Sequence, residues 1–508
     1  MPNHLGFFLV GCIFAVATCG TYASNALPSH DIPPAVLSSL VKNQIPRDAI
    51  SISVLELPVT NNGAAREVID WHAARAMNPA STIKLLTTVT ALDLLGPQYR
   101  WNTKLFTDGL IKNDILKGNL YLQGSGDPKL IPEELERMMK GLRDLGIKKI
   151  DGDLIFDRSA YSPEVMEHHT IDGESLRAYN VPPDPLLYAF RTLSFQINPW
   201  RGDDDVSISY TPPLAQFRVK NQLKPSAQAC DNWRKKVQFE LIKELSPSQK
   251  KPDQWQALFS GELPTACKTI AYNIVPFDAN TFLTLGFAAA WELAGGTWIK
   301  QPQGKSGEVP LFARPLLDFQ GGDLLDAVQD INKFSNNVMA RQVFLTLALE
   351  KIGKPASIQG SERVTQTWLK QRGLHFPELV LENGSGLSRN EAISARHLTD
   401  LLVTARTLPS GELFMNSLPL AGTDGTMKNR LIRQLRQFLH LKKKPEARIK
   451  TGSLTEVRAI SGYVLSKSGK TYAVSSFINH PNAYRGIEAH DQLLMWLLSD
   501  GPEPKQAR

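Results

Sequence analysis

Residues 78–86 read Asn-Pro-Ala-Ser-Thr-Ile-Lys-Leu-Leu and open an apolar run that continues to Leu95. Asn78 can cap a helix because its side chain accepts a free backbone N–H, and Pro79 suits the first helical turn. A glycine and a proline follow Leu95 and end the pattern. The sequence therefore predicts a helix from this stretch to Leu95.

Ser81 and Lys84 stand three residues apart on this helix, so their side chains meet on one face of its first turn. A serine is a weak nucleophile unless a neighbouring group accepts its proton. Ile83, Leu85 and Leu86 surround Lys84, and apolar surroundings lower the pKa of an amine. The pair is either a nucleophile with its general base or an ordinary helix start whose lysine reaches water.

The segments on both sides of this helix predict a mixture of strands and helices. Alternating apolar residues predict a strand at Ile50–Leu57, paired through a turn at Asn61-Asn62-Gly63 with Val68–Trp71. After Leu311 apolar residues recur at helical spacing, and strands follow near the C-terminus. The segments expected there are helices Leu324–Ile331, Val338–Leu349 and Gly486–Leu498 and strands Ala459–Val464 and Thr471–Ile478.

The region from Trp101 to Pro302 has a different pattern. Short strand-like runs such as Asn119–Leu122 and Asp153–Phe156 alternate with turns. Between Asn198 and Cys267 the chain is mostly strand and polar loop. These features predict an inserted β-rich domain that carries a second, smaller insertion.

Two short motifs follow Ser81-Thr82-Ile83-Lys84 along the chain. Ser335-Asn336-Asn337 lies between two predicted helices, and Lys450-Thr451-Gly452 precedes a predicted strand pair. Each motif is weak alone, because other Ser-x-Asn and Lys-Ser-Gly triplets occur in this chain. In this order and context they match the motif set of penicillin-binding proteins and class A β-lactamases.

The chain resembles the penicillin-binding proteins, most closely the class C low-molecular-mass group of the penicillin-binding protein 4 type, peptidase family S13. The marks of the resemblance are the long insertion between the first two motifs, the loop Glu382–Arg389, the segment Ala421–Thr426 and the run Lys450–Leu454. The loop often carries Asp where this chain has Asn383, which leaves the role of that position open.

The resemblance implies a mixed α/β (α+β) fold. It predicts a transpeptidase domain of the serine β-lactamase/DD-peptidase type, in which helices flank an antiparallel sheet, with inserted β-rich domains. The expected limits are a signal peptide at 1–26, the penicillin-binding domain at 27–105 and 290–508, inserted domain II at 106–190 and 266–289, and a small β-rich domain III at 191–265.

The resemblance also implies a catalytic role for five residues. Ser81 would attack the carbonyl of the penultimate D-alanine, with neutral Lys84 as its general base. Ser335 would relay a proton towards the leaving nitrogen, assisted by Lys450. Asn337 would hold the substrate amide and the catalytic lysine.

The third motif would bind the substrate. Thr451 and Ser453, on either side of Gly452, would hydrogen-bond the substrate carboxylate, and the backbone N–H groups of Ser81 and Ser453 would form an oxyanion hole. The implied activity is that of a serine-type D-Ala-D-Ala carboxypeptidase and DD-endopeptidase that penicillin acylates, and it needs no metal or organic cofactor. The alternatives are a β-lactamase and a non-catalytic cell-wall binding protein that kept the fold.

The N-terminus predicts export. Phe7–Ala17 is an apolar run too short to span a bilayer, and small residues at Ser24-Asn25-Ala26 suit a cleavage site, so residues 1–26 indicate a secretory signal peptide. An uncleaved anchor and lipidation at Cys19 are the alternatives. After cleavage only Cys230 and Cys267 remain; in an exported protein an even pair favours a disulfide over two buried thiols.

The formal net charge of +7 suits an exported protein that meets anionic surfaces or acidic polymers. Nucleic acid is not expected as a partner, because no binding motif is present. We expect the protein in the periplasm of a Gram-negative-type bacterium, soluble or loosely attached to the membrane, with peptidoglycan stem peptides as substrates and β-lactams as covalent inhibitors. The resemblance is also compatible with a homodimer.

Two groups of residues have no assigned role. A basic run before the third motif either attracts acidic cell-wall peptide or anionic lipid or is a solvated loop. Tyr161 and Arg191 in the insertion could reach the substrate, although no motif requires it. The basic run comprises Arg433, Arg436, Lys442, Lys443, Lys444 and Arg448.

Overall fold

The computed structural model describes residues 31–59, 63–167, 170–199, 206–246 and 253–501 of the 508-residue chain. The predicted signal peptide at 1–26 and two residues of the predicted turn, Asn61 and Asn62, lie outside the described residues. Within the described part, no helix is both long and apolar enough to cross a membrane.

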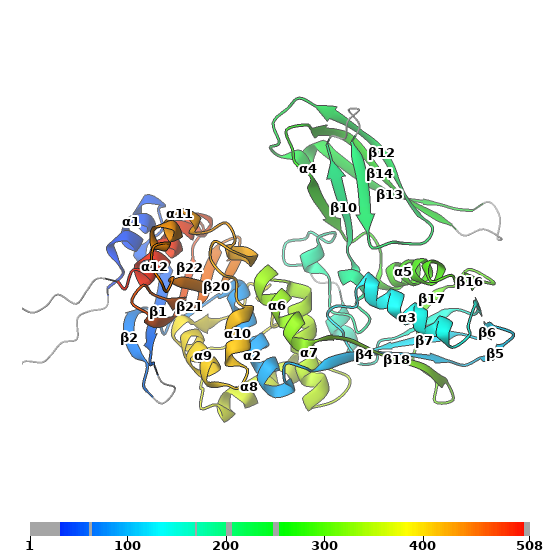
Figure 1. Ribbon diagram of the computed structural model, residues 1–508, viewed down its shortest axis with the longest axis horizontal. Helices are drawn as coiled ribbons and strands as arrows, with labels where there is room; N and C mark the ends of the chain where they lie inside the picture. The colour runs from blue at the N-terminus through cyan, green and yellow to red at the C-terminus, as the bar shows by residue number, and fades with distance from the viewer. Residues whose placement is uncertain (1–30, 60–62, 168–169, 200–205, 247–252, 502–508) are drawn as a thin grey trace, which may run out of the picture.

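An antiparallel five-stranded sheet, in the order β2-β1-β22-β21-β20, forms the centre of one half of the molecule (Figure 1). Strand β1 from the start of the chain pairs with β22 from its end, Ile50 lying opposite Ile478. The predicted hairpins are thereby confirmed as parts of one sheet. Its strands are β1 Ile50–Leu57, β2 Arg66–Trp71, β20 Glu446–Leu454, β21 Val457–Leu465 and β22 Thr471–Asn479.

Helices cover both faces of this sheet. Along β22, Tyr472, Val474 and Ile478 pack into the core beneath α1 and α12, whereas Ala473 and Phe477 pack into the core that holds α2 and α9. Successive side chains of a strand point to opposite faces, and β22 is buried without interruption from Tyr472 to Ile478, so both of its faces are covered. The helices are α1 Pro34–Lys42 and α12 Ile487–Leu498 on the first face, and α2 Lys84–Leu95, α6 Leu324–Phe334, α7 Asn337–Lys351, α8 Ile358–Gln371, α9 Ala395–Thr407 and α10 Gly411–Ser417 in the second core.

The inserted region builds two further sheets, ordered β17-β9-β7-β4-β18 and β16-β8-β6-β5, against helices α3 and α5. Strand β18 pairs antiparallel with β4 of the inserted region, and this pairing continues to Asp323. We therefore propose that the insertion ends near Asp323 and not at residue 289. The elements are β4 Arg100–Thr107, β5 Leu110–Lys112, β6 Ile115–Lys117, β7 Leu120–Gly124, α3 Pro132–Asp144, β8 Lys149–Asp151, β9 Leu154–Asp157, α5 Ala279–Leu293, β16 Thr297–Trp298, β17 Gly304–Ser306 and β18 Arg314–Asp323.

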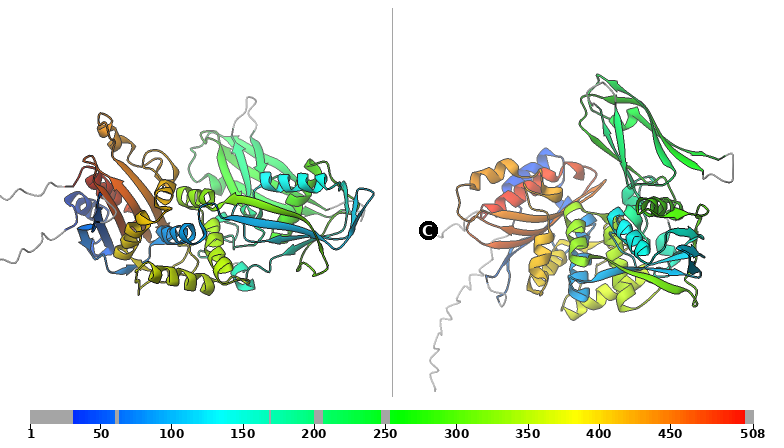
Figure 2. Two further views of the ribbon diagram at one scale, coloured as in Figure 1. Left: turned by 60° about the horizontal axis from the view of Figure 1, so that its bottom comes forward. Right: turned by 45° about the vertical axis from the view of Figure 1, so that its right-hand side comes forward.

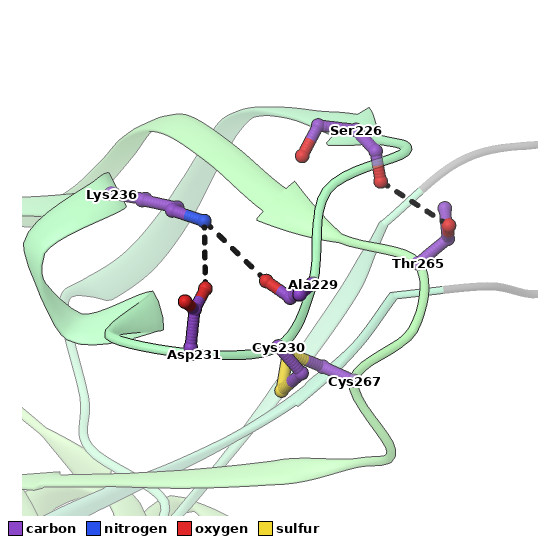
Figure 3. Close-up of a disulfide and its surroundings, with 7 residues drawn as sticks. All are labelled: Ser226, Ala229, Cys230, Asp231, Lys236, Thr265 and Cys267. Carbon is purple, nitrogen blue, oxygen red and sulfur yellow. Dashed lines mark hydrogen bonds and ion pairs between the residues drawn. A yellow bond between two sulfur atoms is a disulfide. The ribbon is translucent and has the colours of Figure 1, made fainter.

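A small β lobe projects from the insertion (Figures 1 and 2). Its two three-stranded sheets, β11-β10-β15 and β12-β14-β13, pack through aromatic rings around the fully buried Phe195. Cys230 and Cys267 are joined by a disulfide (Figure 3) with 4.9 Å between their Cα atoms, so they are not two separate thiols. The elements are β10 Leu193–Asn198, β11 Ser207–Thr211, β12 Phe217–Ser226, α4 Trp233–Lys236, β13 Val237–Glu244, β14 Gln254–Pro264 and β15 Ile270–Ile274.

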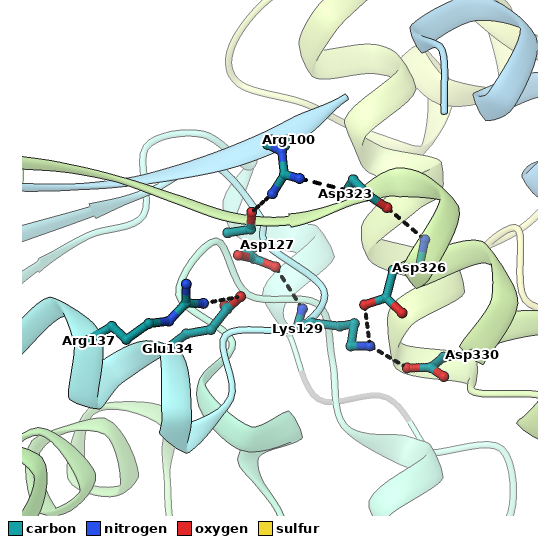
Figure 4. A network of polar contacts seen from close by, with 9 residues as sticks. Arg100, Asp127, Lys129, Glu134, Arg137, Asp323, Asp326 and Asp330 are labelled. Carbon is teal, nitrogen blue, oxygen red and sulfur yellow. Dashed lines mark hydrogen bonds and ion pairs between the residues drawn. The ribbon is translucent and has the colours of Figure 1, made fainter. Parts of the chain in front are cut away.

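A polar network joins the insertion to α6 (Figure 4). The Nζ of Lys129 lies 2.7 Å from carboxylate oxygens of both Asp326 and Asp330 on α6. Two further carboxyl groups, those of Asp127 and Glu134, are buried nearby. Since α6 ends immediately before the second motif, this network connects the insertion to the half of the molecule built on the central sheet.

Candidate active site

Ser81 lies in a 3-10 turn, η2 (Ala80–Ile83), and not in the first turn of an α-helix. The α-helix begins only at Lys84, so the prediction of one continuous helix is wrong at its start and right at its end, Leu95. The Oδ1 of Asn78 does accept a backbone hydrogen bond, but from the N–H of Ala80, which has a left-handed φ of 43°.

Two glycines explain this tight turn, because they let neighbouring backbone approach η2 from two sides. A Cβ at Gly386, whose φ is 79°, would lie 2.1 Å from the carbonyl oxygen of Ala80. A Cβ at Gly452 on β20 would lie 2.7 Å from the carbonyl oxygen of Pro79. The backbone of Ser81 is thus held between the 382–389 loop and the edge strand of the central sheet.

Lys84 is fully buried, and its Nζ makes three hydrogen bonds. It donates to the Oγ of Ser81 at 2.8 Å, to the Oδ1 of Asn337 at 2.7 Å and to the carbonyl oxygen of Ser385. Burial, and next the positive charge of Lys450, hold the pKa of Lys84 well below its usual range. The neutral amine can donate only two of these hydrogen bonds, and its lone pair can then accept the proton of the Ser81 hydroxyl.

Ser335 occupies the junction between α6 and α7, where its left-handed φ of 59° turns the chain. Its Oγ accepts a hydrogen bond of 2.8 Å from the Nζ of Lys450, which also donates to the carbonyl oxygen of Thr451 at 2.9 Å. Asn336 caps α7 through its Oδ1, which accepts the N–H of Met339. Burial lowers the pKa of Lys450 to about 7.

The three motifs meet at one cavity of about 690 Å³. Lys84 and Lys450 are fully buried, and each donates a hydrogen bond to a residue that lines the cavity, Lys84 to Ser81 and Lys450 to Ser335. The Oγ1 of Thr451 donates a hydrogen bond of 2.9 Å to the Oγ1 of Thr426, which also lines the cavity. The predicted site residues that line it are Ser81, Ser335, Asn337, Thr451 and Ser453.

Sequence reasoning also missed residues of the site and added two that are remote from it. Asp172, Tyr179 and Arg389 line the cavity, and only Arg389 lay in a stretch that the sequence had singled out. Tyr161 is 2% exposed and packs against residues of α7, and Arg191 lines a separate small cavity under α5. Neither is among the residues of the active-site cavity, so the suggestion that they reach the substrate is wrong.

The sequence profile of the D-Ala-D-Ala carboxypeptidase 3 (S13) family matches residues 37–499, nearly the whole described chain. The chain belongs to the S13 family. This confirms the predicted family and fold, and with them the enzyme class, a serine-type D-Ala-D-Ala carboxypeptidase.

Two relatives of this S13 enzyme are similar to it in sequence along most of its length. D-alanyl-D-alanine carboxypeptidase DacB of Haemophilus influenzae is 27% identical over 414 residues, 81% of this chain and 82% of the relative. A D-alanyl-D-alanine carboxypeptidase of an Actinomadura species is 26% identical, covering 83% of this chain and 77% of the relative. The crystal structure of penicillin binding protein 4 (dacB) from Haemophilus influenzae is similar in fold, with a TM-score of 0.69 and 22% identity over 91% of this chain and 99% of that one.

Proposed function

We propose that this S13 enzyme removes the terminal D-alanine from peptidoglycan stem peptides through an acyl-enzyme on Ser81. The observation that carries the proposal is the environment of Lys84, a fully buried amine that is hydrogen-bonded to the Ser81 hydroxyl and has a lowered pKa. That arrangement supplies a nucleophile and its base, and a binding protein would need neither.

The reaction begins when Ser81 transfers its proton to the Nζ of Lys84 and its Oγ attacks the carbonyl carbon of the penultimate D-alanine. The developing oxyanion takes hydrogen bonds from the N–H groups of Ser81 and Ser453, which both line the cavity. The proton then passes through the Oγ of Ser335 to the leaving nitrogen. The C–N bond breaks, D-alanine leaves, and the acyl group stays on Ser81.

Water completes the cycle. It attacks the ester carbonyl, gives a proton to Lys84, and the proton returns to the Oγ of Ser81 as the shortened peptide leaves. The hydroxyls of Thr451 and Ser453, with Thr426 beside them, bind the carboxylate of the terminal D-alanine. Lys450 adds positive potential behind them when it is protonated.

The same acyl-enzyme can form when the leaving amine belongs to a second stem peptide, so we also propose DD-endopeptidase activity on cross-linked peptides. Cell-wall peptides lie outside the inner membrane, which together with the predicted signal peptide supports a periplasmic location. The basic run on and after α11 (Ile432–Leu435) is largely exposed, which supports attraction to acidic wall material or anionic lipid. A homodimer stays a prediction.

Digestion of isolated muropeptides tests the activity. The mature protein should convert pentapeptide monomers to tetrapeptides with the mass loss of one alanine, and should split cross-linked dimers. Ser81→Ala should do neither, while its circular dichroism matches that of the wild type. Activity retained in Ser81→Ala would contradict the proposal. Rapid hydrolysis of penicillin, instead of a long-lived adduct, would favour the β-lactamase alternative.

A further inference from the structure

Glu391 is a buried carboxylic acid just beyond the 382–389 loop, and the reaction above does not use it. Its side chain is 1% exposed. One oxygen, Oε1, accepts the backbone N–H groups of Glu382 at 3.3 Å and Asn383 at 3.2 Å. The other, Oε2, is buried and has no hydrogen-bond partner within the described part of the chain. Such a group is costly to bury and needs a reason.

The segment that Glu391 anchors is the one that contacts the general base. The Oδ1 of Asn383 accepts the N–H of Ser385 at 2.9 Å, and the carbonyl of Ser385 accepts the Nζ of Lys84. The neighbouring carbonyl of Gly384 accepts the hydroxyl of Thr87 on α2 at 2.7 Å. The Glu391 carboxylate therefore holds the start of the 382–389 loop, and Ser385 in the middle of that loop accepts a hydrogen bond from Lys84.

Arg341 on α7 is an opposing charge in the same region. Its guanidinium makes one hydrogen bond, 3.4 Å to the carbonyl oxygen of Val181, and its buried Nε has no partner among the described residues. Within the described residues no ion pair joins Arg341 to Glu391, although the negative charge of Glu391 acts to raise the pKa of Arg341 against the lowering effect of burial. The charged groups that act on Lys84 are Lys450 on β20, Glu391 and Arg341.

The signs of these effects follow from the charges. Lys450 and Arg341 disfavour the protonated amine and lower the pKa of Lys84, whereas Glu391 raises it. Burial raises the pKa of Glu391 itself to about 7, with Lys84 acting in the opposite direction. Burial favours the neutral acid of Glu391, whereas a protonated Lys84 favours its carboxylate, so the ionisation of the two groups is coupled.

We propose that Glu391 is a positioning residue for acylation: it anchors the loop that holds Lys84 and supplies the negative charge that opposes Arg341 at that amine. The inference rests on the proposed role of Lys84 as the general base. It assigns two functions to one side chain, an anchor made by Oε1 and a charge, and a substitution can separate them.

Glu391→Gln separates the two functions, because an amide oxygen can still accept the two backbone N–H groups but carries no charge. Without the negative neighbour the protonated form of Lys84 is less favoured, so its pKa falls and the neutral base is present at lower pH. The acid limb of the pH profile for penicillin acylation should move by about one pH unit to lower pH. Arg341→Met removes a positive neighbour, so the same limb should move to higher pH.

Glu382→Gln is the matched control. Glu382 lies on the same loop, where its carboxylate accepts hydrogen bonds from the hydroxyl of Ser388 and the side-chain amide of Asn390, and it is not among the groups that act on Lys84. Its charge raises the pKa of Glu391, so Glu382→Gln favours the ionised form of Glu391 and its acid limb should not move to lower pH.

The second-order rate constant of penicillin acylation, measured against pH for the wild type and the three variants, tests the inference. Opposite shifts in Glu391→Gln and Arg341→Met support it, and Arg341→Met still tests the charge effect if Glu391→Gln does not fold. An unmoved limb in Glu391→Gln, or an equal shift in Glu382→Gln, overturns the inference alone. Absence of acylation at Ser81 in the wild type instead contradicts the proposed function.

Discussion

Lys84 and Lys450 are both fully buried, and burying an amine costs free energy. The proposed catalytic roles of the two lysines explain why the fold buries them. A charged amine loses hydration when it is buried, so the folded protein favours the neutral form. In the proposed mechanism Lys84 uses that preference to act as a base. Lys450, with a pKa of about 7, is half protonated near neutral pH and can donate to the hydroxyl of Ser335.

The burial of Lys450 predicts a pH dependence of stability. Between about pH 7, where the folded protein loses the Lys450 proton, and about pH 10.5, the usual pKa of a lysine, the unfolded chain binds more protons than the folded one. The free energy of unfolding of the wild type, relative to Lys450→Met, should therefore rise across this window. Urea denaturation at a series of pH values measures it. Lys443→Met, at an exposed site, should show no such trend.

At the scale of elements, the fold depends on close backbone approach around η2. Gly386→Ala should lower the free energy of unfolding by about 1–2 kcal/mol for the left-handed backbone, and by a further 1–3 kcal/mol or so for the clash with Ala80. Because the clash displaces the turn that carries Ser81, penicillin acylation should also fall by about 10²-fold.

Gly373→Ala provides the control for that variant. Gly373 has a similar φ of 72°, but nothing lies within 4 Å of a Cβ placed there. It should lose about 1–2 kcal/mol of stability and keep its acylation rate. Equal activity in Gly386→Ala and Gly373→Ala, measured by stopped-flow acylation, would show that the contact with η2 does not position the nucleophile.

The elements also show what a sequence can predict. Periodicity predicted the helices that became α6 and α7 and the strands β21 and β22, because those patterns reflect burial of one or both faces. It did not predict the 3-10 turn at Ser81, which Gly386 and Gly452 impose from distant parts of the chain. For the same reason it missed the carbonyl of Ser385, Glu391 and Arg341, whose effect on Lys84 arises only in the folded chain.

At the scale of the whole molecule, the network in Figure 4 joins the insertion to α6. Burial, and next the charge of Asp127, raise the pKa of Glu134 to about 7. From the usual glutamate pKa of 4.5 up to about pH 7 the folded protein binds more protons than the unfolded chain, so stability falls as pH rises. Glu134→Gln should therefore gain stability relative to the wild type across that window, in thermal denaturation at several pH values.

The control for the Glu134 prediction is Glu133→Gln. Glu133 precedes Glu134 on α3 but is exposed. Its melting temperature should follow that of the wild type at every pH. A parallel pH trend in both variants would mean that burial of Glu134 at the junction is not the cause.

The small β lobe should contribute stability without contributing to catalysis. Cys230 and Cys267 are 37 residues apart, and closing such a loop stabilises the folded state by about 4 kcal/mol on the chain-entropy model. The double variant Cys230→Ser/Cys267→Ser should melt at lower temperature, as wild type does with dithiothreitol, yet be acylated by penicillin at the wild-type rate. A matching loss of acylation would show that the lobe supports the active site.

Mass spectrometry of the mature protein after incubation with penicillin tests the central claim most directly. The account predicts one covalent penicilloyl group, on the tryptic peptide that contains Ser81, in the wild type and none in Ser81→Ala. An unmodified wild-type protein, or an adduct that persists in Ser81→Ala, would contradict the assignment of Ser81 as the nucleophile of this S13 enzyme.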